Sequence, residues 1–244
     1  MNIIPMYIIY IGDILMTSAE LKKQSKSLLS KRWGNATVAT FLFLGLIQIV
    51  AYILSIALIE SPVASGIITF VLSIASIYLV LCFVNYCKKI KNTKTNVKFS
   101  ECFVGLKPFL KYLLITIILG IIAIIIITSA SSLILVSLFT SKTVVILTSV
   151  ILIALVLVLV AMEILFFPLT YVVVLNPGYT FVQLIKTSVK IGWKNSGEIL
   201  YIILSFIGWN ILSIMTCGIG YLWTMPYMEL TYISFVEEKI KELK

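Results

Sequence analysis

Residues 112–138 read YLLITIILGIIAIIIITSASSLILVSL and contain no charged side chain. A helix of about 20 apolar residues crosses the hydrocarbon of a bilayer, because its backbone polar groups are satisfied within the segment. So long an apolar run has no stable place in water. We therefore predict a membrane-spanning helix here.

Other stretches of the chain have the same character. The composition, 61% hydrophobic and 12% charged, contains more apolar side chain than one soluble core would bury. We predict an all-α polytopic membrane protein, with a fourth helix that tilts or kinks at Pro168. Its six expected spans are residues 36–58, 63–86, 112–138, 144–174, 199–216 and 219–238.

The positions of the basic residues predict the orientation. Eighteen of the 19 Lys and Arg residues lie before the first span, between the second and third, between the fourth and fifth, or after the sixth. Lys142 alone lies on the other side. Lysine and arginine are retained in cytoplasmic loops. We expect both termini to be cytoplasmic, with only short turns outside at 60–62, 139–143 and 217–220.

The segment before each pair of spans has apolar residues at helical spacing and lysines on the other face. This predicts three repeats of an amphipathic elbow helix plus a transmembrane hairpin, over about 17–88, 97–175 and 179–240. The sequence Trp33-Gly-Asn35 also matches Trp193-Lys-Asn195. The elbow stripes are Leu21, Leu28, Leu29 and Trp33; Phe99, Cys102, Phe103, Leu106 and Leu110; and Phe181, Leu184, Ile185, Val189 and Trp193.

A basic amphipathic helix with an aromatic at its end suits the inner membrane surface, where lysines meet anionic headgroups. The elbows either anchor and orient the hairpins or form a specific surface for anionic lipid or a membrane-protein partner. The candidate lipid contacts are Lys26, Trp33, Lys107, Lys186 and Trp193.

Two carboxylates fall inside expected spans, Glu163 and Glu229, each near a proline and a Thr-Tyr pair. A charge inside a span costs about 2.5–3.5 kcal/mol on insertion scales, so such groups are candidates for function. They either line a common cavity that binds a proton, a cation or an amine, or lie at the membrane boundary. The candidate polar site is Glu163, Glu229, Tyr171, Tyr232 and Asn85.

The residue types argue against several kinds of catalytic and metal site. Histidine is absent, which excludes Ser-His-Asp and Cys-His catalysis. Cys82, Cys87, Cys102 and Cys217 lack metal-ligand spacing and are typical of small buried hydrophobes. We expect no cofactor, no metal, no nucleic-acid partner and no enzymatic activity. Gly208, Gly218 and Gly220 indicate close helix approach and a tight turn.

The opening LKKQSKSLLSKRWGNA (21–36) and the closing FIGWNILSIMTCGIGYLWTMPYMELTYISFVEE (206–238) resemble a bacterial membrane family, the domain of unknown function 975. The most specific part is Gly218-Ile219-Gly220 followed by Trp223 and Pro226-Tyr227. The resemblance implies a bacterial cytoplasmic-membrane protein and assigns no catalytic residues. Residues 1–15, before a second Met at position 16, are expected to be an extension or an interfacial segment, and 16–244 one membrane domain.

Two functional hypotheses follow. The first is a non-catalytic accessory, envelope-stress or immunity-type factor that acts through lipid or partner contacts, which predicts a packed helical bundle. The second is a small-solute or ion transporter, which predicts that Glu163 and Glu229 face one polar cavity. A membrane-embedded lipid-processing enzyme would need two acids close together.

Overall fold

The computed structural model describes residues 6–93, 97–137 and 142–243, and the side chains of 6–17, 136, 142 and 143 lie outside that description. The expected outer turn at 139–143 thus falls largely outside it, whereas residues 6–15 of the expected extension form the first turns of α1. No strand occurs in the described residues. The helices are α1 (Met6–Leu29), α2 (Trp33–Thr40), a π turn (Phe41–Gly45), α3 (Leu46–Ala57), α4 (Pro62–Asn92), a 3-10 turn (Phe99–Glu101), α5 (Leu106–Ser137), α6 (Lys142–Phe166), α7 (Leu169–Leu175), α8 (Phe181–Lys194), α9 (Ser196–Leu204), α10 (Ile207–Met215) and α11 (Tyr221–Glu242).

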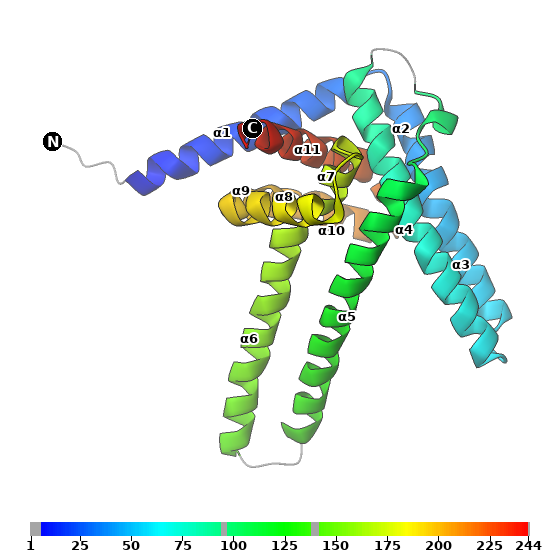
Figure 1. Ribbon diagram of the computed structural model, residues 1–244, viewed down its shortest axis with the longest axis vertical. Coiled ribbons are helices and arrows are strands. Elements are labelled where there is room, and N and C mark those ends of the chain that lie inside the picture. The colour runs from blue at the N-terminus through cyan, green and yellow to red at the C-terminus, as the bar shows by residue number, and fades with distance from the viewer. Residues whose placement is uncertain (1–5, 94–96, 138–141, 244) are drawn as a thin grey trace.

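Two long hairpins make up the lower part of Figure 1, α3 with α4 and α5 with α6. Helices α1, α8, α9 and α11 run across their upper ends. The described residues contain five helices long and apolar enough to cross a membrane. These are Trp33–Ala57, Pro62–Asn92, Leu106–Leu135, Val144–Leu175 and Ser196–Met215.

Helix α11 is the central element of the fold. It packs against α1, α2 and α4, and also against α7, α8 and α10. Its residues Leu230 to Val236 are all buried. A helix enclosed by other helices needs no continuous apolar surface, so α11 accommodates acidic side chains that a lipid-facing helix would not.

The predicted kink at Pro168 is confirmed. Helix α6 ends at Phe166 and α7 begins at Leu169, because a proline ring clashes with the preceding turn and lacks an N–H donor.

The glycine turn is also as expected, since Gly218 has a φ of 87° and an added Cβ on Gly220 would lie 2.7 Å from the Ser213 Cα. Gly208, in contrast, has no close neighbour.

The prediction of a second elbow helix is wrong. Residues 99–101 form only a 3-10 turn, and residues from Leu106 onward belong to the long helix α5. The first elbow is helical, but its apolar stripe does not face lipid: Leu21 and Leu29 are buried, and α1 packs on α11. The threefold repeat is therefore not confirmed.

The third predicted hairpin also differs from expectation. Helix α11 is not among the five apolar helices. Trp223, just after the supposed outer turn, lines the same small pocket as Trp33, the first residue of the apolar helix Trp33–Ala57. Lys22 of α1 donates to the Ser205 carbonyl between α9 and α10. The turn at 217–220 thus lies at the lysine-bearing end of the molecule, and the structure does not support a crossing by residues 219–238.

Candidate functional site

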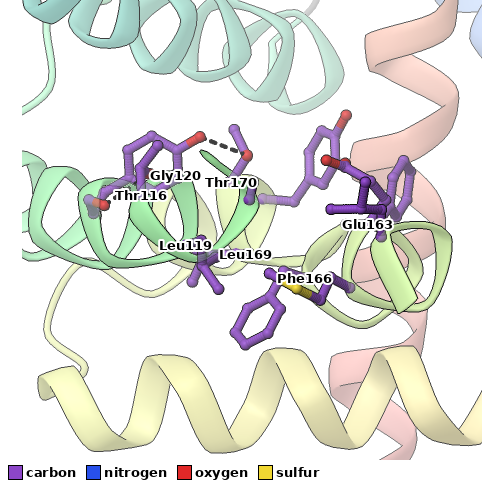
Figure 2. A pocket seen from close by; sticks show the side chains of 13 residues that line it. Thr116, Leu119, Gly120, Glu163, Phe166, Leu169 and Thr170 are labelled. Atoms are coloured by element: carbon purple, nitrogen blue, oxygen red, sulfur yellow. Dashed lines mark hydrogen bonds between the residues drawn. The ribbon is translucent and has the colours of Figure 1, made fainter. Parts of the chain in front are cut away.

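A pocket of about 390 Å³ lies between α5 and α6, at their upper ends. Figure 2 shows Thr116 and Gly120 on one wall, Glu163 and Phe166 on the other, and Thr170 between them. The helical spacing of the α5 residues turns one face of that helix into the pocket. The lining is Tyr112, Thr116, Leu119, Gly120, Ala123, Leu159, Met162, Glu163, Phe166, Phe167, Leu169, Thr170 and Tyr171.

The break at Pro168 places the polar groups of α7 on this pocket. The Tyr112 hydroxyl and the Thr170 hydroxyl lie 3.0 Å apart and share a hydrogen bond. The Thr116 hydroxyl donates to the Tyr112 carbonyl at 2.9 Å. The pocket therefore has polar groups along one side and apolar walls of leucine, methionine and phenylalanine elsewhere.

Glu163 supplies the only carboxylate among the lining residues. Its side chain is exposed, and none of the ion pairs or side-chain hydrogen bonds between described residues involves its carboxylate. An unpaired carboxylate on a surface made mainly of apolar helix is an acceptor for a cation.

Glu229 does not line this pocket. One of its carboxylate oxygens, Oε2, is buried and has no hydrogen-bond partner among the described residues. Its neighbour is Tyr171, whose side chain interacts with it and also lines the pocket. The two carboxylates thus do not line one common pocket, because Glu163 is among the lining residues and Glu229 is not.

Tyr232 belongs to a cluster of aromatic rings. Its ring centroid lies 5.1 Å from that of Phe167, 6.2 Å from that of Tyr171 and 5.7 Å from that of Phe206. Edge-on ring pairs of this kind stabilise packing by about 0.5–1.5 kcal/mol each. Tyr232 is therefore a packing residue of α11 that contacts α7 and the α9–α10 junction.

Asn85 does not join the other candidate residues. Its Nδ2 donates to the Cys102 carbonyl at 2.9 Å, which fastens the α4–α5 connection to α4. Cys102 is buried there, as are Cys82 and Cys87, whereas Cys217 is exposed. The interpretation of the cysteines as buried hydrophobes is thus correct for three of the four.

The predicted lipid contacts lie on the surface. Lys26, Lys107 and Lys186 are exposed, and 76% of the Trp193 surface is accessible. Trp33 is half-buried and shares a pocket with Lys26.

Other basic residues have a role that the sequence analysis missed: they donate to backbone carbonyls near helix ends. Lys88 Nζ donates to the Val174 carbonyl at 2.8 Å, and Lys22 Nζ to the Ser205 carbonyl at 3.0 Å. The last carbonyls of a helix have no partner within it and carry the negative end of its dipole. Arg32 makes the same kind of contact with the Ile90 carbonyl near the end of α4, whereas Lys111 donates to the Tyr179 carbonyl in the loop before α8.

Lys22 has a second partner in addition to the Ser205 carbonyl. Its ammonium also lies 4.3 Å from the centroid of the Phe206 ring, a cation–π arrangement. Burial lowers the pKa of Lys22 below its usual value. A lysine with these two partners holds α1 against the α9–α10 junction, so it is not available to a lipid headgroup.

The comparisons agree with the resemblance noted above. The model of one family, described as "Protein of unknown function (DUF975)", matches residues 16–244. The chain belongs to this family. No curated protein and no solved structure matches it.

Proposed function

We propose that this member of the DUF975 family is a non-catalytic binding protein of the bacterial cytoplasmic membrane, of the accessory, envelope-stress or immunity type. Its ligand is an amphiphile that carries a protonated amine, held at the pocket between α5 and α6. The observation that carries the proposal is the unpaired Glu163 carboxylate on a pocket whose other walls are largely apolar.

The proposed topology has the hairpins α3–α4 and α5–α6 crossing the bilayer. The predicted cytoplasmic lysines lie on α1, the end of α4, the start of α5, α8 and the end of α11, which gather at one end of the hairpins (Figure 1). Lysine retention on the inner side places both termini in the cytoplasm. Helices α9–α11 then lie against the inner leaflet beneath α1.

The pocket chemistry favours an amine with an apolar tail over a bare ion. Coulomb attraction to Glu163 is stronger in a low-dielectric environment than in water, so an ammonium group binds more strongly beside apolar pocket walls than it would in water. The Thr170 and Tyr112 hydroxyls offer hydrogen-bond acceptors to the remaining N–H groups. Leu159 and Leu119 then contact the tail. Such a ligand enters sideways from the lipid, between α5 and α6.

A photoreactive dodecylamine tests this proposal on the full chain in lipid nanodiscs. We expect label on peptides that contain Met162 or Tyr112, removed by excess dodecylamine but not by dodecanol, which has the tail without the charge. Glu163→Gln is expected to lower the labelling about tenfold, as for the loss of a charge-assisted contact.

Glu60→Gln is the matched control, because Glu60 is an exposed carboxylate at the α3–α4 turn, far from the pocket. Unchanged labelling in that variant supports the assignment to Glu163. Equal competition by dodecanol, or full labelling of Glu163→Gln, would show that the pocket takes apolar chains without regard to charge.

Transport through both carboxylates is the alternative, and one contact favours it: Tyr171 touches Glu229 from the pocket side. A proton relay would run from Glu163 through Tyr171 to Glu229. Under this alternative Glu229→Gln abolishes solute uptake as fully as Glu163→Gln does. Under the binding proposal, Glu229→Gln leaves dodecylamine labelling intact, and the double glutamine variant has no uptake defect.

A further inference from the structure

A second pocket, of about 110 Å³, lies where α1 meets the first long apolar helix. It is independent of the Glu163 pocket and is formed by different elements. Three of the four tryptophans of the chain line it. Its lining is Lys26, Trp33, Trp209, Trp223, Thr224 and Tyr227.

The walls of this pocket are held in place by packing and hydrogen bonds. Trp223 and Tyr227 are one turn apart on α11, so they lie on the same face of that helix. The rings of Trp209 and Tyr227 meet edge-on, with centroids 6.4 Å apart. Thr224 is buried, and its hydroxyl lies 3.0 Å from that of Ser213 on α10. The aromatic groups are therefore positioned before any ligand arrives.

The pocket lies at a change of polarity along the chain. Lys26 projects from α1, which carries several lysines, whereas Trp33 is the first residue of a helix with exposed apolar side chains such as Val38. Tryptophan prefers this level of a membrane, because its ring is apolar and its indole N–H is a hydrogen-bond donor. The residues thus match the headgroup and glycerol region of a lipid.

We propose that this pocket binds the headgroup of an anionic phospholipid from the inner leaflet. Lys26 pairs with the phosphate, and the indoles of Trp33, Trp209 and Trp223 contact the glycerol region and the first carbons of the chains. A quaternary ammonium headgroup also suits an aromatic cage, but Lys26 repels it.

Native mass spectrometry of the full chain, purified in mild detergent and offered phosphatidylglycerol or phosphatidylcholine, tests the proposal. We expect one phosphatidylglycerol retained per protein and phosphatidylcholine lost. Lys26→Gln is expected to weaken phosphatidylglycerol retention about tenfold, which corresponds to one charge-assisted contact. Lys23→Gln is the matched control, since Lys23 is an exposed lysine on the same helix and does not line the pocket.

Trp223→Leu, which keeps an apolar side chain but removes the indole, is expected to reduce phosphatidylglycerol retention with little change in thermal stability. Equal retention of both lipids would overturn the proposal, because it indicates non-specific lipid binding. Equal losses in Lys26→Gln and Lys23→Gln would also overturn it, because they indicate general charge attraction. Lys26→Gln leaves dodecylamine labelling at the Glu163 pocket unchanged, so the two proposals fail separately.

Discussion

Gly192 allows α8 to lie directly on the end of α6. A Cβ added at this position would lie 2.5 Å from the Leu165 carbonyl oxygen and 2.6 Å from its Cα. These contacts are with backbone, which cannot turn aside as a flexible side chain can. The same crossing supports one wall of the Glu163 pocket, because Leu165 lies between Glu163 and Phe166 on α6.

Gly192→Ala is therefore expected to destabilise the protein by about 1–3 kcal/mol, the usual cost of overpacking a tight contact. The measurement is thermal unfolding in detergent, followed by circular dichroism. Gly197→Ala is the control: Gly197 lies in α9, an added Cβ there meets nothing within 4 Å, and alanine favours a helix. A loss of stability in Gly197→Ala equal to that in Gly192→Ala would contradict this explanation.

At the scale of elements, the C-terminal part of α11 is tied to two other helices by ion pairs. Glu237 pairs with Lys91 at the end of α4 and, at 3.2 Å, with Lys241 on its own helix. Lys239 pairs with Glu198 at the start of α9 at 3.1 Å. Lys91, Glu237, Lys239 and Glu198 are largely shielded from solvent, so the removal of one partner leaves the other charge without compensation and destabilises the fold.

The ionisation of Glu237 follows from these contacts. Burial acts to raise the pKa of Glu237, but the hydrogen bond and charge of Lys91, with those of Lys241, hold the pKa below its usual value. An acid whose pKa is lower in the folded state stabilises the fold above its unfolded pKa, and this contribution is lost as pH falls through the folded pKa.

We therefore expect the melting temperature of the protein to fall as the pH drops from about 6 to 3, in part through Glu237. Glu237→Gln should have a lower melting temperature near neutral pH and a shallower decline on acidification. Glu60→Gln, which alters an exposed carboxylate, should follow the unmodified protein throughout. Parallel pH profiles for Glu237→Gln and the unmodified protein would show that the α4–α11 pair does not contribute.

For the whole molecule, the decisive feature is the position of the last two helices. Trp223, three residues after the turn at Cys217–Gly220, lines a pocket with Trp33 and with Lys26 of α1, which places this turn toward the end where the lysines gather. The turn at Ser61 between α3 and α4 lies at the far end of the long hairpins (Figure 1). The two turns are therefore on opposite sides of the bilayer in the proposed topology, whereas six crossings would put them on the same side.

Cysteine labelling in intact cells distinguishes these topologies. We expect a membrane-impermeant maleimide to modify Ser61→Cys and to leave Cys217 unmodified. Cys82, Cys87 and Cys102 are buried, so they contribute no background. Modification of Cys217 from outside, in a variant without other reactive cysteines, would restore the six-span topology.

Part of the candidate site could be predicted from residue type and local pattern. Glu163 and Tyr171 do line one pocket, because both lie close to Pro168, whose effect on a helix is local. Glu229 and Asn85 were grouped with them only by similar neighbours in sequence. Their places depend on which helices pack together: Glu229 interacts with Tyr171 but does not line the pocket, and Asn85 donates to the Cys102 carbonyl.

Sequence patterns alone were enough to predict the helical class, five of the long apolar helices, the break at Pro168 and the gathering of lysines at one end. Each of these follows from hydropathy, helix chemistry or charge within a single segment. Three features depend on how helices pack together: α1 packs its stripe on α11, four basic side chains donate to backbone carbonyls, and the third hairpin lies across the others. A helix can be buried without being apolar when other helices of the protein surround its polar groups. Hydropathy along the chain does not predict which helices surround one another.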